Sequence, residues 1–216
     1  YSVYTFQCRR MARFVHGRVI FAGDSAHQVS PFGARGANSG LEDAENIAWK
    51  LDRVLRGTSP EKLLDTYHIE RSAAADENIR ESTRATDFMA PATQQEARLR
   101  KAVLGLAKET EFGKRMVNGG RLSVPSVYDT PLSTADGDDW RAGPRPGTSM
   151  PDAPVADHTG NPLFLTEAFA RKGMRFTLLT FGDDKAVEAP EGVGTIRIGG
   201  EDGMIDAAGL ASKRYD

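Results

Sequence analysis

Gly23 and Asp24 are the residues of this sequence best suited to bind a polar ligand. A glycine lets the backbone approach a ligand closely, and the two oxygens of a carboxylate suit a pair of ligand hydroxyls, such as those of a ribose or ribityl chain. The alternative for Asp24 is that its carboxylate caps a helix or loop. A glycine-rich loop follows, with Pro31, Gly33 and Gly36 as its backbone-determining residues.

The backbone amides of Gly36, Ala37 and Asn38 are predicted to lie at the start of a helix. The first N–H groups of a helix have no partner within it, and the helix dipole is positive at this end. The segment therefore predicts a site for a polar, partly anionic cofactor.

Three further polar side chains accompany this loop. For His27 a structural hydrogen bond is favoured over proton transfer, and Arg35 is either a ligand contact or a solvated loop charge. Ser25 follows a strand as a hydrolase nucleophile would, but that tight turn needs a small residue where His27 stands, and a neighbouring histidine is poorly placed to act as the base. No side chain is assigned as a catalytic acid, base or nucleophile.

The chain has four histidines and one cysteine. The histidines, at positions 16, 27, 68 and 158, lack the spacing of a metal-binding helix, so no metal site is predicted. Cys8 alone cannot form an internal disulfide or a dithiol pair, and it is expected to be packed.

A strand and a helix must position the loop. Residues 19–22 are an apolar run that predicts a buried strand ending at the Gly-Asp pair. Apolar residues recur at three- to four-residue spacing over 41–55, Ser39 and Glu42 form a capping-box pattern, and Gly57 provides a stop signal.

Two more helices are expected downstream. Ser59 and Pro60 match an N-cap and a first helical position, and the helix is predicted to run to about Ala90. An amphipathic helix over 93–117 should pack on it and end at Gly119-Gly120. The inner face expected for that helix is Leu99, Val103, Leu106 and Ala107.

The remaining chain predicts a connector and a small α/β unit. Prolines, glycines and the acidic run 136–139 indicate an extended connector over 119–150. Beyond it, the pattern predicts a helix, two strands and a second helix. Their expected ranges are 163–172, 176–181, 195–198 and 207–213. Gly192 and Gly194 are interpreted as a turn, since no strand leads directly into a helix there.

Composition excludes several classes of function. The 216 residues carry 28 basic and 30 acidic side chains, so the net charge of -2 gives no electrostatic reason to expect nucleic acid or an anionic membrane. No apolar run approaches the roughly 18 residues that span a bilayer, and the first residues do not resemble a signal peptide. A cytoplasmic protein is expected.

The segments 18–27, RVIFAGDSAH, and 31–51, PFGARGANSGLEDAENIAWKL, resemble the GD motif and the following helix of the class A FAD-dependent aromatic hydroxylases. The residues Leu64-Asp65-Thr66-Tyr67 and Glu70-Arg71 resemble the next helix of that family. The tail, with Pro151 to Pro154 and the strand from Phe176 to Phe181, resembles the thioredoxin-like C-terminal domain of the phenol and polyketide hydroxylase branches.

The resemblance implies an α/β chain with part of an FAD-binding domain (residues 1–118), the connector (119–150) and a thioredoxin-like domain (151–216). It implies FAD as cofactor, NAD(P)H as co-substrate and an aromatic small molecule as substrate. Near the ribityl chain and the isoalloxazine ring, the cofactor contacts would be Gly23, Asp24, Pro31, Gly33, Gly36, Ala37 and Asn38. The tail would serve packing or homodimerisation, because it has no redox cysteines.

Departures from the family pattern matter as well. The GxGxxG motif for the FAD diphosphate and the DG motif are absent from these residues, and the sequence is expected to be incomplete at both ends. The alternatives are a non-catalytic binding or dimerisation module, or a related flavoprotein such as a halogenase, a reductase or a ubiquinone-pathway hydroxylase.

Overall fold

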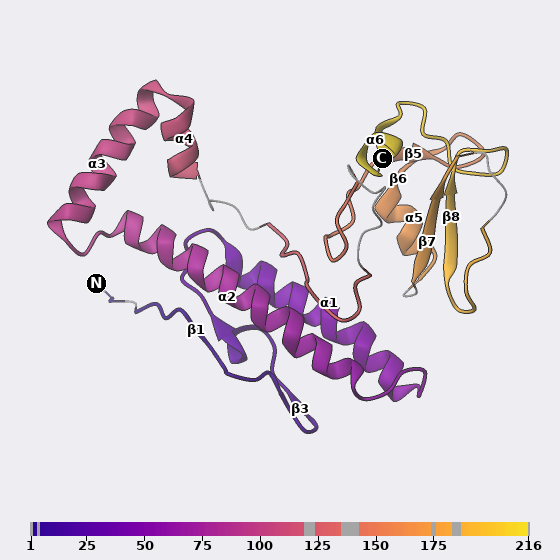
Figure 1. Cartoon of the computed structure of the whole chain (residues 1–216), viewed down its shortest axis with the longest axis horizontal. Helices are drawn as coiled ribbons and strands as arrows, with labels where there is room; N and C mark the ends of the chain where they lie inside the picture. The colour runs from indigo at the N-terminus through magenta and orange to yellow at the C-terminus, as the bar shows by residue number, and fades with distance from the viewer. Residues whose placement is uncertain are drawn as a thin grey trace. The chain divides into compact units, whose positions relative to one another are not determined.

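The computed structural model describes residues 2–3, 5–118, 124–134, 143–173, 176–182 and 187–215. Helices and strands both occur, as expected for an α/β chain, and they form two compact units, Tyr1–Ser133 and Thr134–Asp216 (Figure 1). The division falls inside the stretch 119–150 that the sequence predicts as a connector. The expected stop at Gly119-Gly120 and the acidic run 136–139 lie outside the described residues.

Unit 1 combines short antiparallel strand pairs with long helices (Figure 1). Its elements are β1 (Arg9–Arg10), β2 (Val15–His16), β3 (Val19–Ile20), the 3-10 helix η1 (Gly23–Ser25), β4 (His27–Gln28), α1 (Arg35–Leu55), α2 (Leu63–Met89), α3 (Gln94–Glu109) and α4 (Glu111–Asn118). Strand β1 pairs with β4, and β2 pairs with β3. The apolar core is centred on Phe14 and Tyr67, which both have 0% exposure.

The strand before the Gly-Asp pair is shorter than predicted and is not buried on both faces. It covers only Val19–Ile20, and the Val19 side chain is 55% exposed, whereas Ile20 and Phe21 pack on the core. The cause is a tight hairpin. Gly17, with φ +57°, begins a two-residue loop that folds β3 back on β2, so that alternate residues face solvent.

Helix α1 confirms the predicted helix but begins earlier than the expected cap at Ser39. The residue before its first turn is Ala34, in the left-handed conformation (φ 53°, ψ 37°). Ser39 is therefore buried inside the helix, and the capping-box prediction is wrong. The apolar positions Leu41 and Leu55 are 70% and 77% exposed, so the buried face of α1 is polar. Its buried residues are Arg35, Ser39, Asp43, Asn46 and Lys50.

Helix α2 lies alongside α1 (Figure 1). It starts at Leu63 rather than at Pro60, although the lead-in is already helical in type. Within that lead-in, the N–H of Leu63 donates to the carbonyl of Pro60 at 3.0 Å. The predicted long helix is confirmed, with Ala90 as its C-cap.

The single helix expected over 93–117 is two helices, α3 and α4, which pack against each other. Thr110 is extended and breaks the helix, and its hydroxyl accepts the N–H of Gly113 at 3.0 Å, as an N-cap of α4 does. Gly113 packs directly on the backbone of α3, where a Cβ would lie 2.5 Å from the Leu106 carbonyl carbon. Of the expected inner face only Val103 is buried, and Leu99 is 62% exposed.

Unit 2 has its own core. Its elements are β5 (Pro154–Ala156), β6 (Pro162–Phe164), α5 (Leu165–Arg171), β7 (Thr177–Phe181), β8 (Gly194–Ile198) and α6 (Leu210–Tyr215). Strands β5 and β6 pair antiparallel, and β7 and β8 pair parallel. Both predicted strands are confirmed. Gly192 lies in a turn with φ +80°, as predicted, whereas Gly194 is already the first residue of β8.

Both helices of unit 2 start later than predicted. The first begins at Leu165 because residues 162–164 form β6 instead. The second begins at Leu210 because the Asp206 carboxylate accepts the N–H groups of Ala211 and Ser212 and so fixes its first turn.

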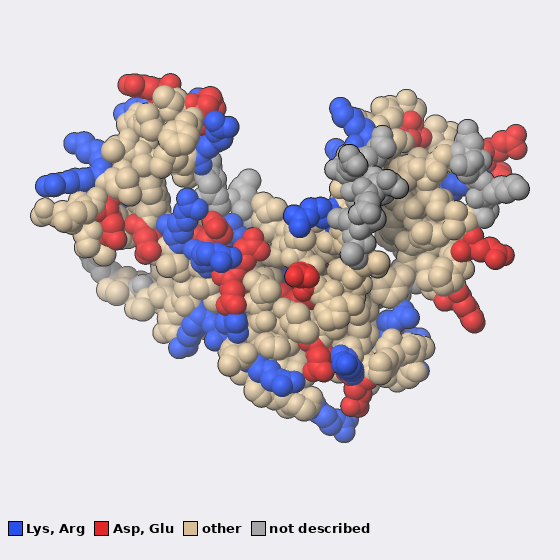
Figure 2. All heavy atoms as spheres, viewed as in Figure 1, with Lys and Arg blue, Asp and Glu red and all other residues tan. Residues whose placement is uncertain are grey.

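The surface carries charges of both signs. Acidic and basic side chains are interspersed over the described residues of the face in Figure 2. None of the described helices is both long and apolar enough to cross a bilayer.

Candidate functional site

The turn that contains Gly23 and Asp24 lies against the first turns of α1. Gly23 has φ +57°, and a Cβ placed on it would lie 3.9 Å from the Cα of Gly40. Its N–H donates to Oδ2 of Asp43 at 2.7 Å. The Asp24 side chain is exposed, and none of the hydrogen bonds or ion pairs among the described residues involves its carboxylate. The carboxylate is thus an exposed acceptor next to a fixed backbone.

The glycine-rich loop leads directly into α1. Pro31 is exposed and Gly33 has φ +94°, a conformation that favours glycine. Just before them, the hydroxyl of Ser30 lies 2.6 Å from that of Ser82 and 2.7 Å from that of Thr86, both on α2. The loop is therefore anchored to α2 through buried hydroxyls.

The N-terminus of α1 carries the other predicted contacts. Gly36, Ala37 and Asn38 lie in its first turn, with Ala37 and Asn38 exposed. Ala34 supplies no side-chain cap, and the first turn contains no acidic residue. The positive end of this 21-residue helix is therefore not balanced by a carboxylate of its own first turn, which favours an anionic or electron-rich ligand.

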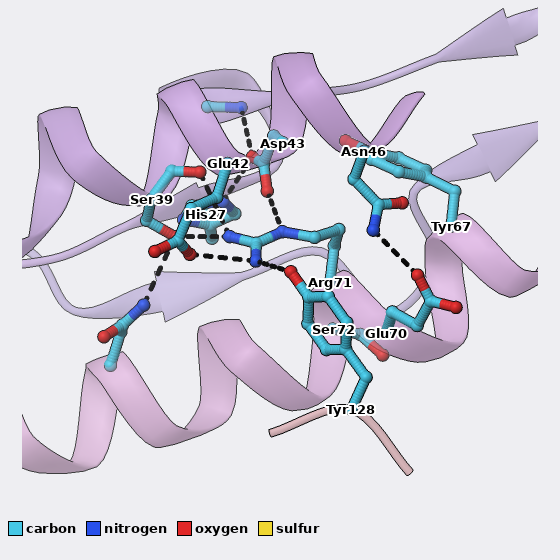
Figure 3. A network of polar contacts seen from close by, with 12 residues as sticks. His27, Ser39, Glu42, Asp43, Asn46, Tyr67, Glu70, Arg71, Ser72 and Tyr128 are labelled. Atoms are coloured by element: carbon cyan, nitrogen blue, oxygen red, sulfur yellow. Dashed lines mark hydrogen bonds and ion pairs between the residues drawn. The ribbon is translucent and has the colours of Figure 1, made fainter. Parts of the chain in front are cut away.

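Asp43 connects the turn to both helices (Figure 3). Its Oδ2 accepts from the Gly23 N–H and from Nε2 of His27, each at 2.7 Å, and its Oδ1 accepts from Nε of Arg71 at 2.6 Å. Burial alone would raise the pKa of Asp43, but the hydrogen bonds from His27, Arg71 and Gly23 lower it overall. The carboxylate is consequently ionised, and both of its oxygens accept hydrogen bonds.

Arg71 has no exposed surface, and its guanidinium lies between Asp43 and Tyr128 (Figure 3). Besides Asp43, its guanidinium donates to Oε2 of Glu42 at 3.0 Å and to the hydroxyl of Tyr128 at 2.6 Å. It also donates to the carbonyl and hydroxyl of Ser39, at 3.1 and 3.0 Å. Burial disfavours the charge, but the hydrogen bonds to Tyr128 and Asp43 and the negative charge of Asp43 outweigh it and raise the pKa of Arg71. The five N–H donors of a guanidinium thus match five acceptors here.

A second buried ion pair lies further along the same helices. Nζ of Lys50 donates to Oε2 of Glu70 at 2.5 Å, and Nδ2 of Asn46 donates to the same oxygen at 2.7 Å. The other Glu70 oxygen accepts from the Thr130 hydroxyl at 2.7 Å. Burial lowers the pKa of Lys50, against the opposing effect of Glu70. The α1–α2 interface is therefore held by charges as well as by apolar packing.

The other polar candidates, His27, Ser25 and Arg35, each make a structural hydrogen bond. His27 is 3% exposed and its hydrogen bond to Asp43 is the structural one expected. Ser25 bonds its hydroxyl to the Ala22 carbonyl at 2.7 Å, so Ser25 and His27 do not form a nucleophile and base pair. Arg35 is 4% exposed and donates to Asn78 at 2.9 Å, which contradicts its reading as a solvated loop charge.

An apolar cavity of about 530 Å³ opens beside the glycine-rich loop, between the C-terminal end of α2 and the α3–α4 pair. Its apolar lining includes Phe32, Phe88, Leu99, Val103 and Met116. The walls carry charges of both signs, from Arg84 and Arg100 and from Asp87 and Glu96. Nη1 of Arg100 also donates to the Met89 carbonyl at 2.8 Å.

Sequence reasoning missed Asp43, Arg71 and Tyr128 as residues that organise the site. One signal was available for Asp43. Polar residues at 39, 43, 46 and 50 recur at helical spacing on α1, which predicts a polar stripe. The contribution of Tyr128 had no local signal, because it depends on a contact between residues 57 positions apart.

Comparison with known proteins agrees with this arrangement. The profile of a family described as an FAD binding domain matches residues 1–82. 6-Methylpretetramide 4-monooxygenase of Streptomyces rimosus is 34% identical over 192 residues, which are 85% of this chain and 33% of that protein. Dialkyldecalin synthase of Streptomyces rugosporus is 36% identical over 140 residues, 63% of this chain and 30% of that protein.

Among solved structures, the flavin-dependent monooxygenase PieE, in complex with FAD and substrate, matches 99% of this chain and 44% of its own, with a TM-score of 0.66 and 25% identity. The chain spans about a third of the length of the two curated relatives described above. Over that span, the chain is related to the class A FAD-dependent aromatic hydroxylases, as its residue pattern predicted.

Proposed function

We propose that the protein to which this chain belongs hydroxylates an aromatic small molecule with NAD(P)H and O2, and that this chain contributes contacts to its FAD. The observation that carries the proposal is the pairing of an exposed, unbonded Asp24 carboxylate with the uncapped N-terminus of α1 at one fixed turn. The first offers acceptors to hydroxyls and the second offers donors to an electron-rich group. Ribityl hydroxyls and the flavin ring present this combination.

The proposed contacts follow the order of the chain. Asp24, next to Gly23, accepts from ribityl or ribose hydroxyls, and Pro31 and Gly33 lie beside the isoalloxazine ring. The first-turn residues Gly36, Ala37 and Asn38 stabilise negative charge on the ring, by about 0.3 to 2 kcal/mol for a partly buried helix terminus. When bound, FAD supplies the redox chemistry through which NAD(P)H and O2 are used. This chain binds the cofactor, orients its ring and shields it.

The aromatic substrate is proposed to contact the cavity beside the loop. Its lining is rich in aromatic and aliphatic side chains, and a few charged residues of both signs could orient polar groups of the ligand. A cavity of about 530 Å³ is in the size range of small-molecule sites.

For residues 151–216 we propose a thioredoxin-like fold that serves packing or homodimerisation. The parallel pair β7–β8, the preceding helix α5 and the separate core support this assignment. With Cys8 as the single cysteine, a dithiol reaction within the chain is excluded. The cytoplasmic location stays a prediction.

Asp24→Ala in the full protein tests the cofactor assignment. Loss of hydrogen bonds to a charged acceptor costs about 1.5 to 3 kcal/mol, so the FAD dissociation constant should rise about ten- to over a hundredfold. The apo-protein should melt as the wild type does, since the carboxylate has no partner among the described residues. Asp52→Ala, which removes an exposed carboxylate paired with Arg56, is the control and should change neither. Unchanged FAD affinity with a lower apo melting temperature would show that Asp24 caps the loop.

A second candidate is ring closure by cycloaddition, without net oxidation, favoured by the similarity to dialkyldecalin synthase and to a solved structure described as the Diels-Alderase PyrE3. Both candidates use the same FAD contacts, so Asp24→Ala does not separate them. Substrate-dependent consumption of NAD(P)H and O2 does, because a hydroxylase requires both and a synthase that only closes a ring requires neither.

A further inference from the structure

We propose that Arg71 and Tyr128 are positioning residues that hold the Gly23–Asp24 turn in place for the cofactor, although neither is assigned a contact with it. The inference rests on the proposed FAD site. It assigns a role to residues 126–130, named here the strap, which are far in sequence from the glycine-rich loop.

The first step is the connection between the turn and Arg71. The Gly23 N–H is fixed by Asp43 Oδ2, and the other oxygen of the same carboxylate is fixed by Nε of Arg71. Because Asp43 is fully buried, a shift of its carboxylate displaces the Gly23 backbone and the adjacent Asp24. The placement of Asp24 therefore depends on Arg71.

The second step is the orientation of Arg71 itself. All five of its hydrogen bonds have specific acceptors, and the shortest to a neutral group is the 2.6 Å bond to the Tyr128 hydroxyl (Figure 3). The Tyr128 ring also lies near the guanidinium, with its centroid 5.9 Å from the Arg71 Cζ. Burial raises the pKa of Tyr128, so the phenol is neutral and acts as an acceptor here. Without that hydroxyl, one buried N–H of Arg71 loses its partner.

The third step is the anchoring of Tyr128 by the strap. Alternate strap residues bond to α2 through hydroxyls: Ser126 donates to Glu77, and Thr130 donates to Glu70, each at 2.7 Å. Alternate residues of an extended segment face the same side, so Tyr128 between them is directed at α2 as well. The chain of contacts runs from the strap through Tyr128, Arg71 and Asp43 to the Gly23 N–H. Of the three strap residues that bond to α2, only Tyr128 takes part in this series of contacts.

This difference within the strap supplies a matched experiment. Tyr128→Phe, Ser126→Ala and Thr130→Val each delete one hydroxyl that bonds to α2, but only Tyr128→Phe interrupts the contacts that reach Gly23. All three full-length proteins are titrated with FAD, well below their melting temperatures. We expect the dissociation constant of Tyr128→Phe to rise about tenfold, and those of the two controls to stay within about twofold of wild type.

Amide hydrogen exchange of the apo-proteins provides a second readout that needs no cofactor. Exchange over residues 22–27 should be faster in Tyr128→Phe than in either control. If exchange and FAD affinity of Tyr128→Phe match those of the controls, Tyr128 is a structural residue only and the inference is overturned. If the wild type binds no FAD, the proposed function fails, and the exchange result still decides whether Tyr128 holds the turn.

Discussion

Buried charges are the unusual feature of this chain at the scale of single residues. Asp43, Lys50 and Arg71 all have 0% exposure, and each has an oppositely charged partner within 2.7 Å. Burying an ion pair gives little net stability compared with apolar residues, but removing one partner leaves an uncompensated charge. Such groups therefore fix geometry more than they stabilise the fold, which fits the contacts of Asp43 and Arg71 next to the Gly23 turn.

Asp43→Asn is expected to destabilise the protein in a pH-dependent manner. The pKa of Asp43 is lowered below 3.8 in the folded state, so its contribution is complete above the unfolded value and is lost as pH falls through the folded pKa. At neutral pH the variant should lose about 3 to 5 kcal/mol. The difference from wild type should then shrink below pH 3.8, by at most about 1.4 kcal/mol per pH unit. Urea unfolding of both proteins at several pH values measures this, and a constant difference from pH 5 to pH 2 would contradict it.

The N-terminus of α1 shows how one element combines strain and function. Among the described residues, Ala34 is the only non-glycine with positive φ, and it directly precedes the turn proposed to face the flavin. A left-handed conformation costs an alanine roughly 1 to 2 kcal/mol. The strain is tolerated because the buried residues Arg35 and Ser39 hold the helix in this register.

Ala34→Gly should therefore stabilise the protein. Relief of the strain exceeds the extra chain entropy of glycine, for a net gain of about 0.5 kcal/mol. The matched control is Ala48→Gly, the same substitution at an exposed position inside α1, which should cost about 1 kcal/mol. Chemical denaturation gives both values. Equal losses in the two variants would mean that the Ala34 conformation is not strained.

The sequence predicted the helices better than their boundaries. Spacing and stop signals located α1 and α2, because these are local properties of the chain. Ser39 and Glu42 matched a capping box, yet both accept hydrogen bonds from Arg71 of the next helix. These tertiary contacts determine where the two residues lie in α1. The break at Thr110 was missed for the same reason, since it depends on Gly113 meeting the backbone of α3.

The candidate site, too, could be predicted from the sequence only in part. The short segment around Asp24 and the glycine-rich loop could be recognised from residue types, because backbone freedom and helix termini leave local signals. The contacts that hold this segment in place could not be found in that way. Asp43, Arg71 and Tyr128 are brought together only by the packing of α1, α2 and the strap.

At the scale of the whole molecule, each unit has its own apolar core. In unit 1 the core is formed around Phe14 and Tyr67 by the hairpin and α2, and in unit 2 it is formed by residues such as Leu165 and Ile198. No residue belongs to both described cores. Separate cores predict that the two units unfold as separate cooperative segments.

Leu165→Ala tests this independence. Leu165 has 0% exposure in the unit 2 core, so its truncation should cost about 2 to 5 kcal/mol. Hydrogen exchange should accelerate across β5 to α6, while the protection of α1 and α2 stays at the wild-type level. The reciprocal variant is Phe14→Ala, at a fully buried position of unit 1, which should cost about 3 to 5 kcal/mol and accelerate exchange in unit 1 alone. Faster exchange of both units in either variant would show that they form one cooperative structure.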